Sequence, residues 1–325
     1  DGRVELGLLF GGAEYISAYA LNYVYSPEAR DATLYVGSDD TVRVWLNGRL
    51  VHEYPAGREA VPRQDAVRVT LKAGRNVLLV KVGNGIVEHR FYLSAGGPFD
   101  RGLARAERGL WREAAGQTAK GLAAEPAEHP VPWVQDTILK RAAGDNTGYR
   151  RAAARLMERF GRSPSAGVLT AVARACSLGP DAVPDAARLV EMALREEAKE
   201  NWRITHVALA RYRAGQPEQA VQAIKQRGAD DWPVAWPVLA LAHHRLGKKD
   251  VARQWLDRAE TWLEEWLDEA LAGPGVKLPL PWMDWAEFQV LRREARQALG
   301  AGKSRADEKL EQLDTRARQQ LRKIP

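Results

Sequence analysis

Over the first hundred residues, apolar and polar positions alternate with a period of two. Within the string TVRVWLNGRLVHEY, the apolar positions Val42, Val44 and Leu46 are separated by Arg43 and Trp45. This alternation is typical of a strand with one buried face. Asn47-Gly48 predicts a type I′ hairpin turn, since both residues tolerate a positive φ. More strings of this kind, separated by glycine-containing turns, predict an antiparallel β-sandwich over residues 1–97.

From residue 98 onward the period becomes that of an α-helix, and Gly96-Gly97-Pro98 marks the boundary. A motif then recurs, in which a glycine is followed by an alanine five residues later. It occurs as Gly109–Ala114, Gly148–Ala153, Gly215–Ala220 and Gly247–Ala252, and Ala186 is the anchor of one more unit. The anchor alanines are 39, 33, 34 and 32 residues apart. Glycine ends a helix and alanine allows close helix crossing, so residues 98–299 are predicted to form an α-solenoid of about five stacked hairpins.

The last segment, residues 300–325, is rich in charge and poor in large apolar residues. Leu310, Leu313 and Leu321 place a weak apolar stripe on it. This pattern predicts a charged C-terminal helix that caps the solenoid, or a tail that frays. The predicted fold class is therefore multidomain β + α, with a β-sandwich followed by an α-solenoid.

Two stretches of the predicted sandwich, GSDDTVRVWLNGRLV and LKAGRNVLLVKVGNG, resemble the sugar-binding jelly-roll domain at the front of β-galactosidase-type glycosidases. They are also similar to its galactose-binding-like relatives. The resemblance implies a jelly-roll sandwich with a carbohydrate-binding role for residues 1–97. A fold of this kind does not by itself fix the ligand.

The spacing of the anchor alanines resembles that of the tetratricopeptide repeat, a helix–turn–helix unit of about 34 residues. The strings LAHHRLG, ARQWLDRA and LRREA are similar to the C-terminal tails of large bacterial proteins in which a kinase or a WD-repeat propeller precedes such an array. This resemblance implies that the chain is the non-catalytic part of a larger bacterial signalling protein. A first residue of Asp1, where a complete chain would have Met, also indicates a processed or longer protein.

Four residues of the predicted sandwich are candidates for a sugar or calcium site. Asp39 and Asp40 can bring two carboxylates to a sugar or to Ca²⁺, which prefers oxygen ligands. Alternatively, they shape a tight turn by accepting backbone hydrogen bonds. Trp45 can stack on a sugar ring or pack on its sheet, and Arg43 can join the same site or remain solvated. Calcium is the one cofactor that the sequence suggests.

The predicted solenoid presents an apolar and aromatic groove. Its lining consists of Trp202, Thr205, Leu209 and Tyr212 from one repeat, and of Val234, Leu241 and His244 from the next. We expect this groove to bind a peptide or protein segment. The lysine and asparagine pair with which chaperone-binding tetratricopeptide domains capture a terminal carboxylate is not evident. The seven tryptophans between residues 232 and 285 are expected to pack against alanine-lined helices, with a ligand cage as the alternative.

Charge and composition narrow the classes of partner. The 48 basic and 42 acidic residues give a net charge of +6, and residues 1–97 hold 11 of each sign. No run gathers positive charge into a stripe, so we expect no nucleic-acid partner. No apolar stretch approaches the roughly 20 residues of a membrane span. The sequence leaves a cytoplasmic and an exported location equally open.

The residue patterns that usually carry catalysis are not found. The sequence has no Gly-x-Ser-x-Gly elbow, no His-Glu-x-x-His motif, no phosphate-binding loop and no kinase signature. His243 and His244 are adjacent on a predicted helix and point about 100° apart, so no metal site is expected. The single cysteine, Cys176, is expected in the core. We therefore expect a chain that is not an enzyme: a protein-interaction scaffold, or alternatively a carbohydrate-binding module on a helical-repeat spacer.

Overall fold

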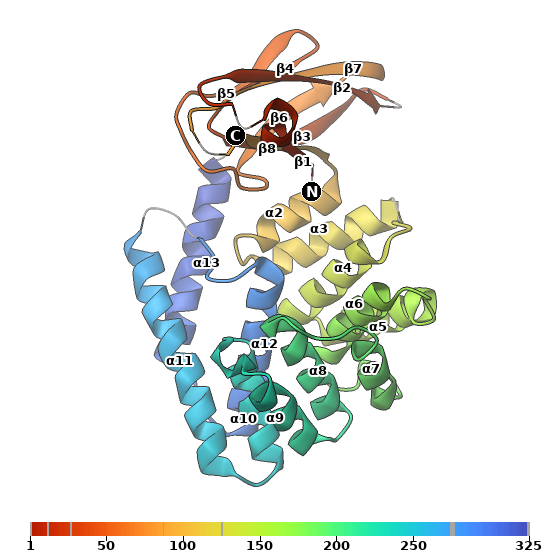
Figure 1. Ribbon diagram of the computed structural model, residues 1–325, viewed down its shortest axis with the longest axis vertical. Helices are drawn as coiled ribbons and strands as arrows, with labels where there is room; N and C mark the ends of the chain where they lie inside the picture. The colour runs from red at the N-terminus through yellow and green to blue at the C-terminus, as the bar shows by residue number, and fades with distance from the viewer. Residues whose placement is uncertain are drawn as a thin grey trace. The chain divides into compact units, whose positions relative to one another are not determined.

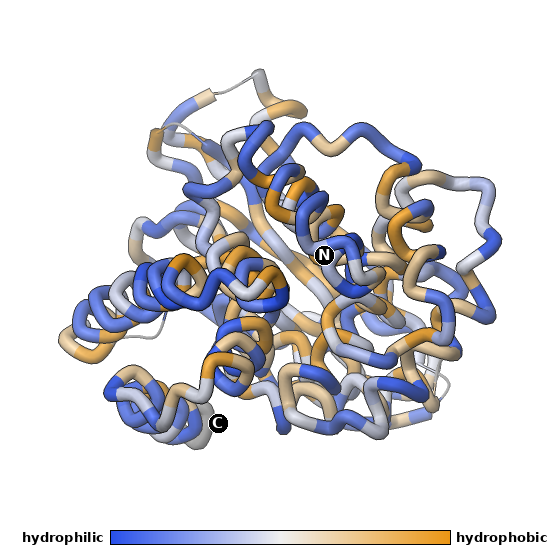
Figure 2. The backbone as a smooth tube through the Cα atoms, turned by 90° about the horizontal axis from the view of Figure 1, so that it is seen from below, coloured by the Kyte–Doolittle hydropathy of each residue, from blue (hydrophilic) through white to orange (hydrophobic). Residues whose placement is uncertain are grey.

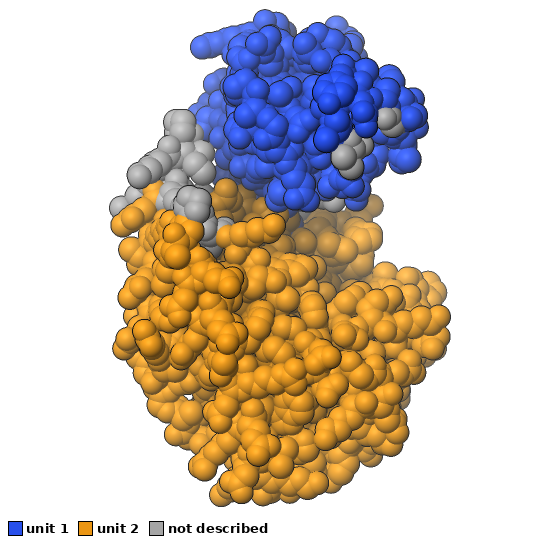
Figure 3. Space-filling view, turned by 60° about the vertical axis from the view of Figure 1, so that its left-hand side comes forward, with its two compact units in different colours: residues 1–101, 322–325 blue, residues 102–321 orange. Residues whose placement is uncertain are grey.

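The computed structural model describes residues 2–11, 13–26, 28–86, 88–124, 126–273 and 277–323. The chain divides into two compact units, a sheet unit of residues 1–101 with 322–325 and a helical unit of residues 102–321 (Figure 3). The described residues contain two antiparallel sheets with eight strands in all, and thirteen α-helices. The prediction of a multidomain chain that combines β and α structure is confirmed at this level.

The sheet unit contains two four-stranded sheets, and every pair of neighbouring strands is antiparallel (Figure 1). The first sheet has the order β1 (Arg3–Glu5), β8 (Arg90–Gly96), β3 (Arg30–Asp39) and β6 (Asp65–Leu71). The second has the order β2 (Ser17–Ser26), β7 (Gly74–Gly83), β4 (Thr41–Leu46) and β5 (Arg49–Tyr54). A short helix, α1 (Leu6–Phe10), follows β1.

Alternation along the strands gives each sheet one apolar face. Val42, Val44 and Leu46 of β4 are buried, as their spacing predicts. The buried faces of both sheets contribute to one hydrophobic cluster, because apolar side chains gain free energy by leaving water together. The hairpin turn is also confirmed, since Asn47 and Gly48 both have positive φ, of 50° and 83°.

Helices make up the rest of the chain. In order they are α2 (Pro98–Ala106), α3 (Trp111–Ala124), α4 (Pro130–Ala142), α5 (Asn146–Phe160), α6 (Ala166–Ser177), α7 (Ala186–Ala193), α8 (Asn201–Arg213), α9 (Pro217–Gln226), α10 (Ala235–Arg245), α11 (Lys249–Ala272), α12 (Trp282–Ala298) and α13 (Arg305–Lys323), with a 3₁₀ turn at Ala229–Asp231. Hydrophobic and hydrophilic residues alternate along them (Figure 2). None of the described helices is both long enough and apolar enough to span a membrane.

The glycine of the repeat motif lies in three of the inter-helix turns. Gly109, Gly215 and Gly247 lie between helices with positive φ, a conformation that glycine adopts without strain. The prediction for Gly148 is wrong, because this residue lies inside α5, close beneath the capping carboxylate of Asp145. Gly144, with a φ of 80°, makes that turn. The spacing rule therefore fails where an aspartate N-cap starts the helix before the expected glycine.

The anchor alanines are small because helices pack closely around them. Four of them, Ala114, Ala153, Ala220 and Ala252, are fully buried. Ala186 is only half-buried, since it is the first residue of α7. Cys176 lies in the core as predicted, and burial raises the pKa of its thiol to about 12, which leaves it unreactive at neutral pH.

One helix departs from the sequence of neighbouring pairs. α12 packs against α4 and α10 and forms hydrogen bonds to α6 and α8. The side of these four helices on which α12 lies is called the inner face. Trp285 of α12 stacks on Phe288 with ring centres 5.5 Å apart, and Trp262 and Trp266 of α11 meet Trp285 edge-on. Trp285 belongs to the core of the helical unit, and Trp262 and Trp266 pack against that core, as expected for these three tryptophans.

The C-terminal segment forms helix α13 as far as Lys323. Leu313 is buried on it and Leu310 is half-buried. Lys309 forms an ion pair with Asp268 of α11, which holds α13 against the helical unit. The side chain of Leu321 and residues 324 and 325 lie outside the described part of the structure.

Replacing Trp285 by alanine is expected to lower the free energy of unfolding by about 3–5 kcal/mol, because the ring is 1% exposed and its loss leaves a cavity among three aromatic rings. Urea unfolding followed by far-UV circular dichroism measures the change. Leu194→Ala is the matched control, since that side chain is largely exposed and its loss shifts stability by under about 0.5 kcal/mol. Equal losses in the two variants would contradict the packing role.

Candidate functional site

The predicted groove residues lie on α8 and α10 or directly before α10. Five of them are buried: Thr205, Leu209, Tyr212, Val234 and Leu241. Trp202 is 39% exposed, and His244 is half-buried. The chain's own residues therefore cover most of the surface that the repeat pattern assigns to a partner, and Trp202 remains accessible.

Side-chain hydrogen bonds hold α12 on the inner face. Arg213 of α8 donates to Glu294 of α12, with 2.7 Å between Nη2 and Oε2. Arg293 of α12 donates to the backbone carbonyl of Ala142 at the end of α4, over 3.0 Å. Charged hydrogen bonds of this kind fix orientation as well as proximity. α12 is thus held on the inner face by charged hydrogen bonds to its neighbours.

A buried ionic cluster anchors the first half of α12. Nε of Arg174, from α6, donates to Oε1 of Glu287 at 2.6 Å, and its Nη2 donates to Oδ1 of Asp284 at 2.9 Å. Nε2 of His206, from α8, lies 2.9 Å from Oε2 of Glu287. Glu287 is 2% exposed. Three helices therefore meet at one carboxylate whose two oxygens both have partners.

The charges of this cluster determine its titration. Burial alone would raise the pKa of Glu287, but the charges and hydrogen bonds of Arg174 and His206 lower it to about 2. Burial raises the pKa of Asp284. The positive charge of Arg174 lowers this pKa but offsets only part of the increase, and the negative charge of Glu287 raises it further. Glu287 is consequently the ionised centre of the cluster.

The same cluster contains a set of metal-binding residue types. One donor atom each from His206, Asp284 and Glu287 lie within 4.8 Å of one another, and zinc takes ligands of these types. Arg174 donates a hydrogen bond to each of the two carboxylates. Its guanidinium supplies the positive charge that a cation would otherwise bring, so the geometry is that of an ion-pair network.

The sequence analysis missed this cluster, because Arg174 and Asp284 are 110 residues apart. One local signal was present. Asp284 and Glu287 stand three residues apart within the string WMDWAEF, so they share one face of a helix whose other residues are apolar. Two carboxylates in such surroundings require a buried cation as partner.

A pocket lies beside the cluster, at the accessible tryptophan. It has a volume of about 240 Å³ and is lined by residues of α4, α6, α7 and α8, by Glu196 and by Met283 of α12. Val134, Ala171 and Val207 give it apolar walls, and Trp202 stands among its lining residues. A cavity of this size and polarity accommodates one large apolar side chain.

Two arginines and a histidine contact Trp202. The guanidinium carbons of Arg174 and Arg203 lie 5.7 and 5.6 Å from the centre of its ring, and His206 meets the ring edge-on at 5.5 Å. Arg203 is itself paired with Glu196, another lining residue. These contacts hold the indole in place while leaving over a third of it exposed.

In the sheet unit, the carboxylate of Asp40 accepts a backbone hydrogen bond, whereas Asp39 is distinguished by its burial and by the charges around it. Oδ2 of Asp40 accepts a hydrogen bond from the backbone N–H of Gly85 at 2.7 Å, and the hydroxyl of Ser38 donates to the Asp40 carbonyl at 2.9 Å. Burial and the adjacent charge of Asp40 raise the pKa of Asp39, against a smaller opposing effect of Arg90. Both aspartates line a shallow pocket of about 320 Å³.

The structure does not bring Arg43 and Trp45 to these aspartates. Both project from the outward side of β4, and Arg43 forms an ion pair with Glu53 of β5 at 2.6 Å. Arg43 lines a different pocket from the one that Asp39 and Asp40 share. The four candidates therefore divide between two places on the unit.

The outward side of the second sheet carries a row of tyrosines that the sequence analysis did not single out. On β2, Tyr19, Tyr23 and Tyr25 are 62%, 52% and 75% exposed. They alternate with inward residues, and half-buried Trp45 lies on the same side of β4. These four residues are called the tyrosine face. The period-two spacing of YALNYVY was the signal that could have revealed it.

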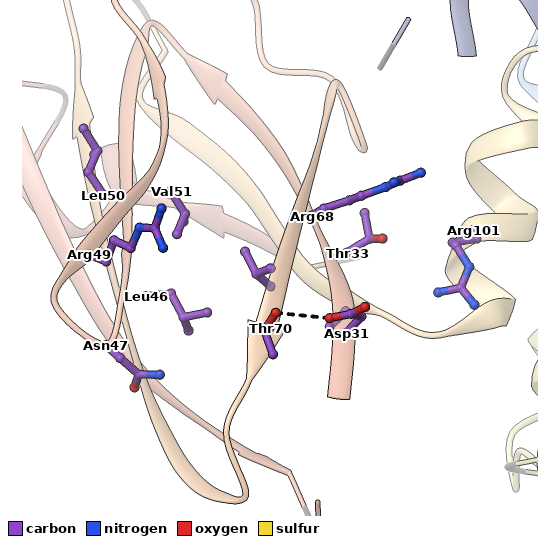
Figure 4. Close-up of a pocket in the computed structure, with 12 residues that line it drawn as sticks. Asp31, Thr33, Leu46, Asn47, Arg49, Leu50, Val51, Arg68, Thr70 and Arg101 are labelled. Atoms are coloured by element: carbon purple, nitrogen blue, oxygen red, sulfur yellow. Dashed lines mark hydrogen bonds between the residues drawn. The ribbon is translucent and has the colours of Figure 1, made fainter. Parts of the chain in front are cut away.

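The sheet unit also has a cleft of about 830 Å³ (Figure 4). It lies among β3, the end of β4, β5 and β6, with buried Leu46 and Val69 among its lining residues. Arg49 of β5 and Arg68 of β6 also line it. The hydroxyl of Thr70 donates to Asp31 over 3.1 Å.

Comparisons with known proteins add little to this geometry. No family model matches the chain, and no curated protein matches it. Among solved structures, the chain is similar to the GH26-CBM35 β-(1,4)-mannanase of Podospora anserina, with 12% sequence identity and a TM-score of 0.18 over 74% of this chain. The chain spans 63% of the length of that structure. A likeness this weak carries no argument about fold or ligand.

The prediction that the chain is not an enzyme is corrected. The solved structure to which the chain is similar is that of an enzyme, a mannanase. A TM-score of 0.18 is too low to assign an enzymatic activity to this chain. The prediction rested on missing local motifs, and the fold shows why that reasoning is insufficient. Arg174, His206 and Glu287 meet in space from positions up to 113 residues apart, so functional groups can be assembled without a local motif.

Replacing Glu287 by glutamine is expected to lower the free energy of unfolding by about 3 kcal/mol at pH 7, because it removes the ionised centre of a buried cluster. The carboxylate stabilises the fold fully above about pH 4.5, and this contribution is lost as the pH falls towards the folded-state pKa of about 2. Urea unfolding at pH 7, 4 and 3 should therefore show a shrinking difference between variant and parent. A difference that stays constant would contradict the assignment, and Glu265→Gln on exposed α11 surface is the control.

Proposed function

We propose that the helical unit is a tetratricopeptide-like solenoid that binds a peptide or protein segment at the pocket beside Trp202. The observation that supports this most is an apolar cavity of about 240 Å³ on the inner face, next to Met283 near the start of α12. Repeat arrays use their inner helices to bind partners. The chain would then be part of a larger bacterial signalling protein, as its resemblance implies.

The chemistry of the pocket defines the partner's anchor. Its walls are apolar and Trp202 is a large, partly exposed ring, which is the residue type most often found at the centre of binding interfaces. The rim carries the ion pair of Arg203 and Glu196, and the hydroxyl of Thr170 donates to the same carboxylate at 3.2 Å. We therefore propose one leucine, methionine or aromatic side chain as the anchor, with the partner's backbone held by the polar rim.

Selection of a displayed peptide library on the full chain tests this function. Enriched peptides should share one large apolar residue, and Trp202→Ala should weaken their binding about tenfold or more, because it removes one wall of the pocket. Ala171→Leu should have a similar effect by filling the pocket. Trp255→Ala, on α11 and outside the pocket, should bind as the parent does. Peptides that bind the Trp202→Ala and Ala171→Leu variants as tightly as the parent would exclude the pocket.

A second function is proposed for the sheet unit, as a galactose-binding-like jelly-roll sandwich that binds a glycan on the tyrosine face. The exposure of Tyr19, Tyr23 and Tyr25 on one side of one sheet supports it, since aromatic rings present a broad apolar surface with a polar tip. Arg75 and Lys81 of β7 lie over the rings of Tyr23 and Tyr19, at 4.8 and 5.7 Å. They would supply hydrogen-bond donors to sugar hydroxyls.

A glycan array probed with the full chain tests this second function. Tyr23→Ala should abolish the signal of any bound neutral glycan, whereas Tyr23→Phe should keep it, because stacking needs the ring and not the hydroxyl. Added calcium should leave the signal unchanged, because the tyrosine face does not include Asp39 or Asp40. Glycan binding that persists in Tyr23→Ala, or that requires calcium, would move the site to the aspartates.

A further inference from the structure

The cleft of the sheet unit carries more positive charge than its surroundings. Among the described lining residues, three guanidinium groups, those of Arg49, Arg68 and Arg101, compare with one carboxylate, that of Asp31 (Figure 4). This excess is local, because residues 1–97 hold equal numbers of basic and acidic side chains. A cleft with low-dielectric walls and charge of one sign attracts ligands of the opposite sign.

Other arginines of the sheet unit have acidic partners. Arg43, Arg58 and Arg90 form ion pairs with Glu53, Asp65 and Glu88. Within the described residues, Arg49 and Arg68 form no ion pair and no hydrogen bond through their side chains. They come from β5 and β6, which are edge strands of the two different sheets. Two free guanidinium groups therefore flank the opening from opposite sheets.

The residues that line the cleft restrict the chemical class of the ligand further than its charge alone does. None of the described residues that line the cleft is aromatic, so this part of the lining offers no ring on which a nucleobase would stack. The carboxylate of Asp31 repels a bare inorganic anion, but it accepts hydrogen bonds from hydroxyl groups, as it does from Thr70. Buried Leu46 and Val69 offer apolar contact. A volume of about 830 Å³ lies in the range of about 300–1,000 Å³ that small-molecule ligands occupy.

We propose that this cleft binds an acidic saccharide, whose carboxylate or sulfate group is held by Arg49 and Arg68 and whose hydroxyls are bound by Asp31. Guanidinium groups match the planar geometry of a carboxylate and also bind sulfate oxygens. The inference goes beyond the glycan binding proposed for the tyrosine face, because it concerns another site and another class of sugar. The two can therefore fail independently.

Isothermal titration of the full chain with four probes tests the proposal. The probes are trigalacturonate, sulfated galactotriose, neutral galactotriose and inorganic sulfate. We expect one or both acidic trisaccharides to bind, with an affinity that falls as salt is added. Arg49→Gln and Arg68→Gln should each weaken binding about tenfold or more, because each removes a charged hydrogen-bond donor. Whether the carboxylated or the sulfated probe binds more tightly identifies the source of the anion.

Matched variants separate the cleft from general charge. Lys72→Gln removes one exposed positive charge of the same unit away from the cleft, and it should leave binding unchanged. Tyr23→Ala should also leave it unchanged. The proposal is overturned if neutral galactotriose binds as tightly as the acidic probes, if inorganic sulfate competes at equal concentration, or if Lys72→Gln weakens binding as much as Arg68→Gln. Arg49 and Arg68 are exposed, so their variants are expected to keep the parent's circular dichroism and melting temperature.

Discussion

The helical unit depends on one buried carboxylate. Removing Glu287 from water costs several kcal/mol, and only the partners supplied by Arg174 and His206 offset that cost. These partners come from two other helices, so the carboxylate is stable only when α6, α8 and α12 are all in place. An apolar side chain at position 287 could pack in many orientations. An ion pair with fixed hydrogen bonds is satisfied in only one orientation. The ion pair therefore specifies where α12 lies on the inner face.

The position of α12 decides how much of the inner face is accessible. A repeat array with an open inner face would offer Leu209, Val234 and Leu241 to a partner, but these residues are buried in this chain. What remains is a confined pocket at Trp202, bounded by the same ionic cluster that fixes α12. In the sheet unit, the accessible features are instead a flat aromatic face and a charged cleft.

Local patterns were sufficient for the elements but not for the site. Alternation at Val42, Val44 and Leu46 predicted β4 and its buried face, because burial in a strand repeats every two residues. The glycine and alanine spacing likewise predicted three of the inter-helix turns. The contact of Arg174 with Glu287 could not be predicted, since it depends on how helices far apart in the sequence pack together. The Arg49 and Arg68 pair was equally hidden, because the sequence does not say which strand edges flank one cleft.

The long-range placement of α12 also has a consequence for how the unit folds during synthesis. Independent repeats can form one after another, because each contacts only its neighbours. Here Trp111 donates to Gln289 across 178 residues, and Arg293 donates to Ala142 across 151. Contacts between residues so far apart in the sequence form late and slow the folding of a chain. The first helices therefore leave the ribosome with an exposed apolar face. The unit becomes a single cooperative structure only after α12 has been synthesised and has packed against them.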